Sequence, residues 1–290
     1  MATPFATPRA RALGFGLRAC RTDRDLGVRE LARLIGVLPQ ELSNWEYGKR
    51  IPKVEQVALL LGVLVVEPGE RARLLELAGN AREPSWLEKA VPPFVSAYVE
   101  YERAATEIFN WEPLLVPGLL QTDEYARALL GGGGLKANDI ENLVLVRRMR
   151  RGVLAGLRPA SCQVVIDERA LRPGIAEGEV MAGQLRHLLA VSRRKNLRLQ
   201  ILPSGDLVHP GLHGNFAIFE FEALPPIVAI EEFRAVAYLY DEDQVASYRE
   251  AAEGLAASAL DEQGSSALIE AMVADLEVRS GSGGVAGFQP

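Results

Sequence analysis

Residues 35 to 52, with the sequence IGVLPQELSNWEYGKRIP, carry the signals around which the amino-terminal part of the chain is built. Gly36 predicts a sharp turn at the end of one helix, because glycine adopts a positive φ at the lowest cost. Pro39 suits the first turn of the next helix, where its missing N–H is not needed. The stretch therefore predicts two short helices that meet at a steep angle, the second running from about Pro39 to Tyr47.

The flanking residues extend this pair to a bundle of five helices. Helical spacing of apolar residues predicts the other helices from about Arg11, from Val28 to Ile35, from Val54 to Leu64 and from Glu67 to Asn80. The side chains expected to face the core are Leu13, Leu17, Cys20, Leu31, Leu34, Ile35, Val37, Leu42, Trp45, Val57, Leu60, Leu61 and Leu64. Arg18 and Arg21 are expected on the opposite face of the first helix.

The second helix of the pair has a polar face that suits the edge of a base. The side chains left facing outward are Gln40, Glu41, Ser43 and Asn44. Gln and Asn pair bidentately with adenine in the major groove. Lys49 and Arg50 follow Gly48, where a loop could lay them along phosphates. The alternative is a bundle that only contacts proteins, but such a bundle needs no cluster of amide side chains followed by Gly-Lys-Arg.

Residues 13 to 64 resemble the Xre/Cro-repressor-type helix-turn-helix domain. The matching motifs are Ile35-Gly36-Val37, the polar helix Gln40 to Asn44, Trp45-Glu46, Gly48-Lys49-Arg50 and Pro52. By that resemblance, Gln40, Glu41 and Asn44 contact bases. The residues that contact the DNA backbone are then Arg29, Ser43, Lys49 and Arg50. Glu46 is expected to brace a basic residue inside the domain.

Two positions depart from the pattern of that family. Val28 stands where the family often has a polar residue that holds a phosphate, with Arg29 next to it. Pro39 stands at the first base-facing position, where it has nothing to donate. Recognition is therefore expected to depend on dimer geometry and partner state as well as on the helix's own side chains.

Length and charge indicate two domains with different partners. The chain has 290 residues, of which 48% are apolar and 24% charged, a globular composition. Residues 1–80 carry 12 Lys and Arg against 9 Asp and Glu, whereas residues 81–290 carry 20 against 29. The excess of acidic residues in 81–290 repels phosphate. This part of the chain is therefore expected to lie away from the duplex or to bind a ligand that is not a nucleic acid.

Cys20 and Cys162 have apolar or small neighbours and are expected to be two buried thiols. The first residues lack the basic start and long apolar run of a signal peptide, and no apolar run approaches 18 residues. The protein is therefore expected to be soluble and cytoplasmic.

The carboxy-terminal part combines helical and strand-length patterns. Strands are predicted for the runs IFNWE, CQVVIDE, LRLQILP, NFAIFEFE, PPIVAIEEF and AVAYLY. A helix from Glu179 to Arg194 separates the second run from the third, which predicts a parallel pair joined by a right-handed crossover. The other helices are expected at 94–106, 123–130, 138–154, 242–259 and 261–278, with Met149 among the core residues of the third.

The expected organisation is a flexible lead (1–10), an all-α helix-turn-helix domain (11–81), a proline-containing linker (82–93), an α+β domain with a mixed sheet flanked by helices (94–279), and a flexible tail (280–290). Five segments of the α+β domain resemble a second family: VPGLLQTDEYARALL, VLVRRMRRGVL, VVIDERALR, VMAGQLRHLLAVSRRKNLRLQILP and GNFAIFEF. They are similar to the domain of unknown function behind the helix-turn-helix of actinobacterial antitoxin-like (WhiJ-like) transcription regulators. The resemblance implies a regulator often encoded beside a small partner protein, with no established catalytic residues.

The α+β domain offers residues for a ligand or partner site. They are Trp111, Tyr125, Arg147, Arg148 and Arg151, since aromatic rings could wall an apolar pocket and arginines could hold an anion. The alternative is that the aromatic residues belong to the core and the arginines pair with Asp167, Glu168 or Glu231. A third interpretation turns the arginine helix toward a partner protein or the DNA backbone.

Catalysis is a weaker alternative. Asp167, Glu168 and Arg169 at a strand end, and His209 and His213 in a Pro/Gly-rich loop, could serve acid/base chemistry. Carboxylates at a strand end are more often solvated, and Pro210-Gly211 prevents the helical spacing that a metal-binding histidine pair needs. No motif for nucleophilic, nucleotide-dependent or metal-dependent chemistry is present, so no enzyme, cofactor or metal is expected.

These patterns favour a sequence-specific DNA-binding transcription regulator that acts as a homodimer. Its acidic domain is expected to pair two copies and to receive a protein or small-molecule signal. The alternative is an antitoxin-like protein that neutralises a small partner encoded nearby and binds DNA for autoregulation.

Overall fold

The computed structural model describes residues 7–82, 87–89, 97–155, 159–172, 174, 176–205, 208–222, 224–232 and 235–282. Most of the predicted lead, linker and tail lies outside these residues. The chain divides into two compact units. The first comprises Met1–Ala105, Phe221–Pro225 and Glu231–Leu239, and the second Thr106–Glu220, Pro226–Ile230 and Tyr240–Pro290.

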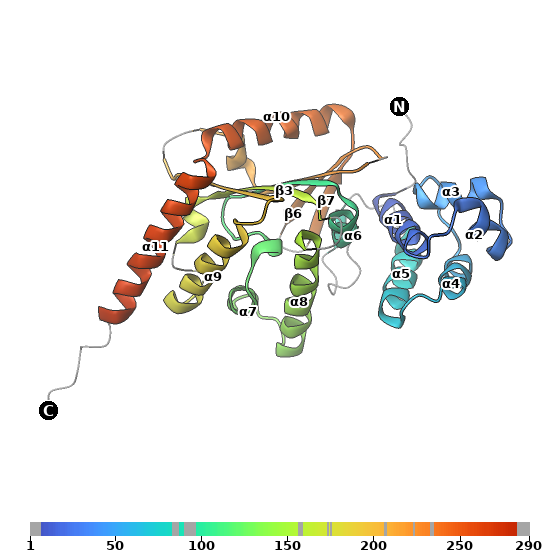
Figure 1. Cartoon of the computed structure of the whole chain (residues 1–290), viewed down its shortest axis with the longest axis horizontal. Helices are drawn as coiled ribbons and strands as arrows, with labels where there is room; N and C mark the ends of the chain where they lie inside the picture. Colours follow the sequence, from blue (N-terminus) through green and yellow to red (C-terminus); the bar gives the residue numbers. More distant parts are fainter. Residues whose placement is uncertain are drawn as a thin grey trace. The chain divides into compact units, whose positions relative to one another are not determined.

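The first unit contains the predicted five-helix bundle (Figure 1). Its helices are α1 Pro8–Thr22, α2 Val28–Ile35, α3 Pro39–Glu46, α4 Val54–Val63 and α5 Pro68–Asn80. Helix α1 begins three residues before the expected Arg11 because Thr7 caps it: the Thr7 hydroxyl accepts a hydrogen bond from the Ala10 N–H at 2.9 Å.

The core of the bundle follows the helical spacing of the sequence. The predicted side chains that are buried are Leu13, Leu17, Cys20, Leu31, Ile35, Leu42, Trp45, Val57, Leu60, Leu61 and Leu64. Burial raises the pKa of the Cys20 thiol to about 11, which suits an inert core residue. The prediction for Leu34 was wrong: it is 50% exposed, because Leu31, Ala32 and Ile35 already fill the inner face of α2.

Helix α1 also packs against elements far along the chain that belong to the same unit. Helix α6, Ala97–Ala104, places the Tyr101 hydroxyl where it donates to the Pro8 carbonyl at 2.6 Å. The Phe15 ring stacks on Phe221 with centroids 4.7 Å apart. Strand β1, Leu87–Lys89, falls in the predicted linker and pairs antiparallel with β7, Ala235–Leu239. The helix-turn-helix bundle therefore shares its core with residues beyond position 220.

The sheet is mixed, as predicted. Its remaining strands are β2 Glu107–Glu112, β3 Ser161–Asp167, β4 Leu197–Leu202, β5 Phe216–Glu220 and β6 Ile227–Glu232. Strand β3 runs parallel to β2 and β4, with Val164 opposite Asn110 and Leu199, whereas β5 runs antiparallel to β2 and β6. The strand order is β1-β7-β6-β5-β2-β3-β4, and helix α9, Gly178–Val191, makes the predicted crossover from β3 to β4.

Helices cover both faces of the sheet in the second unit (Figure 1). Helices α7 Asp123–Gly131, α8 Ala137–Arg150 and α9 lie on one face, and α10 Glu242–Ser258 lies on the other. Helix α11, Glu262–Ser282, packs against α9. The prediction for Met149 was wrong: it is 61% exposed, because α8 turns Val144 and Val146 inward instead.

Cys162 is a buried free thiol on β3, as predicted. Within the residues that the structure describes, no helix combines the length and apolar composition needed to cross a membrane.

Candidate nucleic-acid interface

The turn between α2 and α3 has the geometry that the sequence predicted. Gly36 ends α2 with a φ of 70°, a left-handed conformation, and the Val37 N–H donates to the Ala32 carbonyl at 3.0 Å. Leu38 then adopts an extended conformation, with φ −72° and ψ 141°, and Pro39 opens α3. The glycine thus redirects the chain sharply enough for α3 to leave α2 at once.

Helix α3 has one buried face and one open face. Leu42 and Trp45 are buried against the bundle and fix the rotation of the helix. Gln40 is exposed, and Glu41, Ser43 and Asn44 are half-buried. The Gln40 side-chain N–H donates to the Asn44 side-chain oxygen at 3.3 Å, so the two amides lie together one helical turn apart. The pair still offers both donors and acceptors to a base edge.

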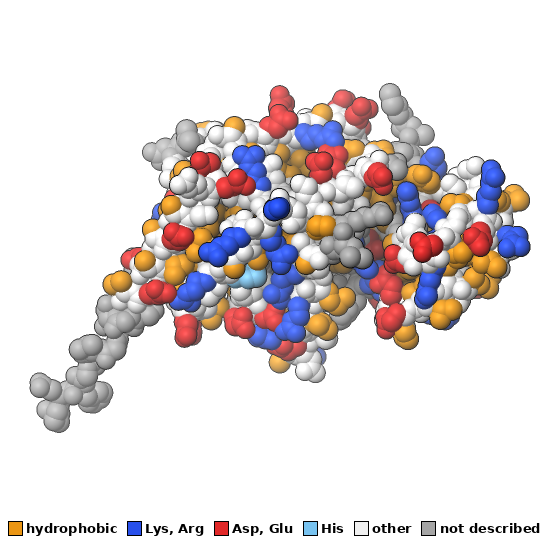
Figure 2. All heavy atoms as spheres, viewed as in Figure 1, with side chains coloured by type: hydrophobic (Ala, Val, Ile, Leu, Met, Phe, Trp, Pro, Cys, Tyr) orange, Lys and Arg blue, Asp and Glu red, His pale blue; other side chains and the backbone are white. Residues whose placement is uncertain are grey.

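The loop after α3 folds back over the end of the helix. The backbone N–H groups of Lys49 and Arg50 both donate to the Asn44 carbonyl, at 2.9 and 3.2 Å. Gly48 has a φ of 64° and lies so close to α1 that a Cβ atom there would be 2.5 Å from the Cα of Arg11. The side chains of Lys49 and Arg50 are exposed as a result. Arg29, at the start of α2, is exposed as well. Figure 2 shows Lys and Arg side chains among exposed hydrophobic ones over this bundle.

A buried ion pair holds the end of α3 to α1. The Arg21 guanidinium donates to both carboxylate oxygens of Glu46, from Nε at 2.6 Å and from Nη2 at 2.8 Å. The hydrogen bond that Arg21 donates to Glu46 raises the pKa of Arg21 despite burial. The bracing role predicted for Glu46 is confirmed, whereas the outward position predicted for Arg21 was wrong: its pairing with Glu46 draws it inside.

In the α+β part, the structure places the predicted ligand-site residues in two groups. Trp111 and Tyr125 are fully buried, and the Trp111 indole N–H donates to the Gly211 carbonyl at 3.0 Å. Arg148 and Arg151 both pair with Asp123 in the first turn of α7, rather than with the acidic residues that the sequence suggested. Arg147 is half-buried on the same helix as Arg148.

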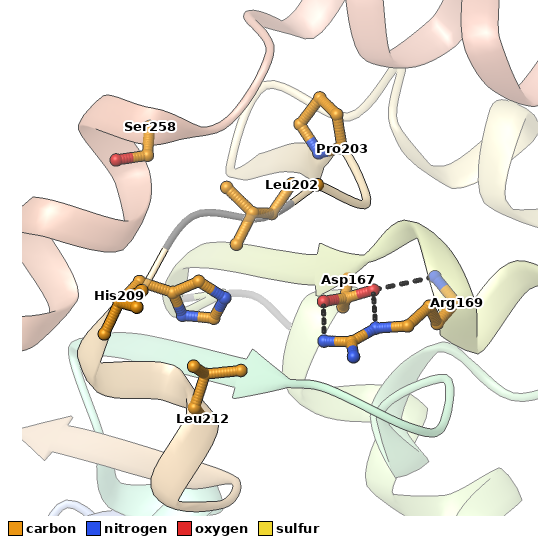
Figure 3. Close-up of a pocket in the computed structure, with 9 residues that line it drawn as sticks. Asp167, Arg169, Leu202, Pro203, His209, Leu212 and Ser258 are labelled. Atoms are coloured by element: carbon orange, nitrogen blue, oxygen red, sulfur yellow. Dashed lines mark hydrogen bonds and ion pairs between the residues drawn. The ribbon is translucent and has the colours of Figure 1, made fainter.

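A cavity of about 280 Å³ lies at the carboxyl ends of β3 and β4 (Figure 3). Its lining residues are Asp167, Arg169, Leu202, Pro203, Gly205, Val208, His209, Leu212 and Ser258. Burial alone would raise the pKa of Asp167, but hydrogen bonds from the Arg169 side chain and backbone lower it. Asp167 therefore stays ionised and neutralises Arg169.

Of the other acid/base candidates, His209 lines the same cavity as that pair, whereas Glu168 and His213 are not among its lining residues. Glu168 binds Arg172 at 2.9 Å and accepts from the Ser204 N–H at 2.9 Å, and His213 is exposed. In the described ranges, no three His, Cys, Asp or Glu side chains converge as metal ligands would.

Comparison with known proteins assigns a family to both parts of the chain. A model described as a helix-turn-helix domain matches residues 12–74, and a model described as a domain of unknown function, DUF5753, matches residues 95–271. No curated protein and no solved structure matches the chain. The first match, together with the geometry of α2 and α3, indicates a DNA-binding regulator of transcription. Because the second match covers more than half of the 290 residues, the chain belongs to the DUF5753 family and carries a helix-turn-helix domain ahead of the domain that defines it.

Proposed function

We propose that this protein is a sequence-specific DNA-binding transcription regulator that inserts α3 into the major groove. The observation that supports it most directly is the polar face of α3, where the amides of Gln40 and Asn44 lie side by side. Lys49 and Arg50 follow on a loop fixed to the same helix, at the place where phosphates flank a groove. Base contacts from the amides and phosphate contacts from the loop would together set affinity and register.

We further propose that it acts as a homodimer in the cytoplasm, without catalytic activity. A helix of eight residues contacts too few base pairs to select one site in a genome. Two-fold pairing, with half-sites roughly 34 Å apart or a multiple of it, is the usual solution. Residues 81–290 carry an excess of nine acidic charges, so they suit pairing and the reception of a protein or small-molecule signal better than contact with phosphate.

Selection of bound sequences from a random DNA pool, with the full-length protein, tests this proposal. We expect an enriched inverted repeat whose half-site centres lie about one or two helical turns apart. The variant Gln40→Ala/Asn44→Ala should enrich a degenerate motif from the same pool. Failure of the unaltered protein to enrich any motif would contradict sequence-specific binding.

A second candidate, an antitoxin-like interaction protein, is favoured by the surface of α8. Leu145 and Met149 lie one helical turn apart and are both exposed, an arrangement that suits a protein partner. Co-expression with a short protein encoded by a neighbouring gene should then yield a complex, and Met149→Glu should prevent it. A complex that forms equally well with Met149→Glu would remove α8 from the contact.

A further inference from the structure

Leu38, at the N-cap of α3, is the most conspicuous apolar side chain near the proposed DNA-binding face. It is 71% exposed, and no side chain caps the helix at this position. We propose that Leu38 contacts the 5-methyl group of a thymine in the major groove and so contributes to specificity. This inference rests on the proposed insertion of α3 into DNA.

The residue is locally unfavourable in two respects. Ser, Thr, Asp and Asn stabilise a helix from the N-cap, whereas Leu leaves the first N–H groups without a side-chain acceptor. A large apolar side chain that stays in water also contributes none of the stabilising free energy that its burial would supply. Positions where a sequence breaks local rules without a visible structural gain are often functional sites. A ligand that buries Leu38 would explain both departures.

The neighbouring residues make the tip of α3 apolar and poor in donors. Pro39, also exposed, has no N–H, so this end of the helix is less suited to a phosphate than an ordinary helix start. On the major-groove edges of base pairs, the thymine methyl is the group that apolar side chains contact. Leu38 and Pro39 therefore fit a methyl better than they fit a hydrogen-bonding base edge.

The amide pair on the same helix is consistent with this assignment. Gln40 and Asn44 are suited to adenine, and they begin two residues after Leu38. A half-site that combines a thymine facing Leu38 with an adenine facing the amides would satisfy both ends of α3. The structure thus assigns a half-site rich in A·T pairs.

The test removes the methyl group alone. In the site selected by the full-length protein, each thymine is replaced in turn by deoxyuridine, which keeps base pairing and loses only the 5-methyl. We expect one thymine per half-site at which the replacement weakens binding of the unaltered protein about fourfold, the effect of one buried methyl. Leu38→Ala should bind the original site correspondingly more weakly and should not distinguish thymine from deoxyuridine there.

Leu114→Ala is the matched control, because Leu114 is 66% exposed on the second unit, and it should retain the discrimination. If the unaltered protein still binds its site specifically but tolerates deoxyuridine at every position, thymine recognition would be overturned and the proposed function would stand. Discrimination that persists in Leu38→Ala would also overturn it, and a changed oligomeric state in that variant would assign Leu38 to a subunit contact. Absence of any site-specific binding would overturn the proposed function together with this inference.

Discussion

The guanidinium of Arg21 and the carboxylate of Glu46 form a bidentate pair inside the helix-turn-helix bundle, with N–O distances of 2.6 and 2.8 Å. Arg21 Nη1 also donates to the Leu26 carbonyl at 2.6 Å, so the turn before α2 is held by the same side chain. One arginine therefore connects α1, the turn into α2 and the end of α3. Its loss should loosen the element that is proposed to read DNA.

We expect Arg21→Met to lower the local stability of α1 and α3 by about 3–5 kcal/mol, because the buried Glu46 carboxylate would lose its partner. Hydrogen exchange of the amides of α1 and α3 measures this free energy of opening. Arg127→Met is the control, since Arg127 pairs with Glu141 on the surface, and it should have no measurable effect. Equal protection in both variants would contradict a bracing role for Arg21.

Two glycines of the first unit should respond to alanine in opposite directions. Gly48→Ala should destabilise the bundle by more than about 1 kcal/mol, because it combines a positive φ with a clash against the backbone of Arg11. Gly62→Ala should stabilise it by about 0.5–1 kcal/mol, since Gly62 lies within α4 and a Cβ there meets no neighbouring atom. Thermal unfolding compares the two. A loss of stability in both variants would show that the space around Gly62 is not open.

Leu38→Ser should separate stability from recognition. A serine at the N-cap of α3 can accept a hydrogen bond from the first turn, so the bundle should gain about 1 kcal/mol. The same variant should lose any preference for thymine over deoxyuridine. Thermal unfolding and binding measured on one preparation would show both effects. An unchanged stability would mean that water already satisfies the Gln40 N–H, since the Glu41 N–H donates to the Leu38 carbonyl.

The histidine on α9 should make stability depend on pH. Burial is the main cause that lowers the pKa of His187, and Arg151 and Arg194 lower it further. The unfolded chain binds a proton near the ordinary value of about 6.5, and the folded chain binds it only at a lower pH. The contribution of His187 to the free energy of unfolding is then fully present above about pH 7. It is lost as the pH drops below 6.5 toward the folded pKa.

We therefore expect a shallower loss of stability between pH 7.5 and 5.5 in His187→Gln than in the unaltered protein, measured by urea unfolding at each pH. Equal pH dependence in the two proteins would show that His187 is not shielded from protonation in the fold.

Much of the fold could be predicted from local patterns. The turn at Gly36 and the inward positions of Leu42 and Trp45 follow from residue types and helical period. The parallel pair β3 and β4 follows from two apolar runs separated by a helix. The inner role of Glu46 was predicted as well, by resemblance. In each case the signal lies within a short stretch of sequence.

The contacts that could not be predicted join distant positions. Phe15 stacks on Phe221, and neither residue carries a pattern that points to the other. Arg11 is likewise buried among aromatic rings, with its guanidinium 4.7 Å from the Phe221 centroid, and burial lowers its pKa to about 10. Periodicity indicates which face of a helix is apolar, but not what covers it. For the same reason Leu34 and Met149 were expected in the core and are exposed.

The affinity of Asn44→Ala for the selected site and for a shuffled duplex of equal composition tests most directly whether α3 reads base edges. We predict a loss of about 1–3 kcal/mol on the selected site and little change on the shuffled duplex. Lys49→Ala is the comparison: it should weaken binding to both duplexes and flatten the dependence of log affinity on log salt by about one unit. An equal loss on both duplexes for Asn44→Ala would contradict base reading by α3.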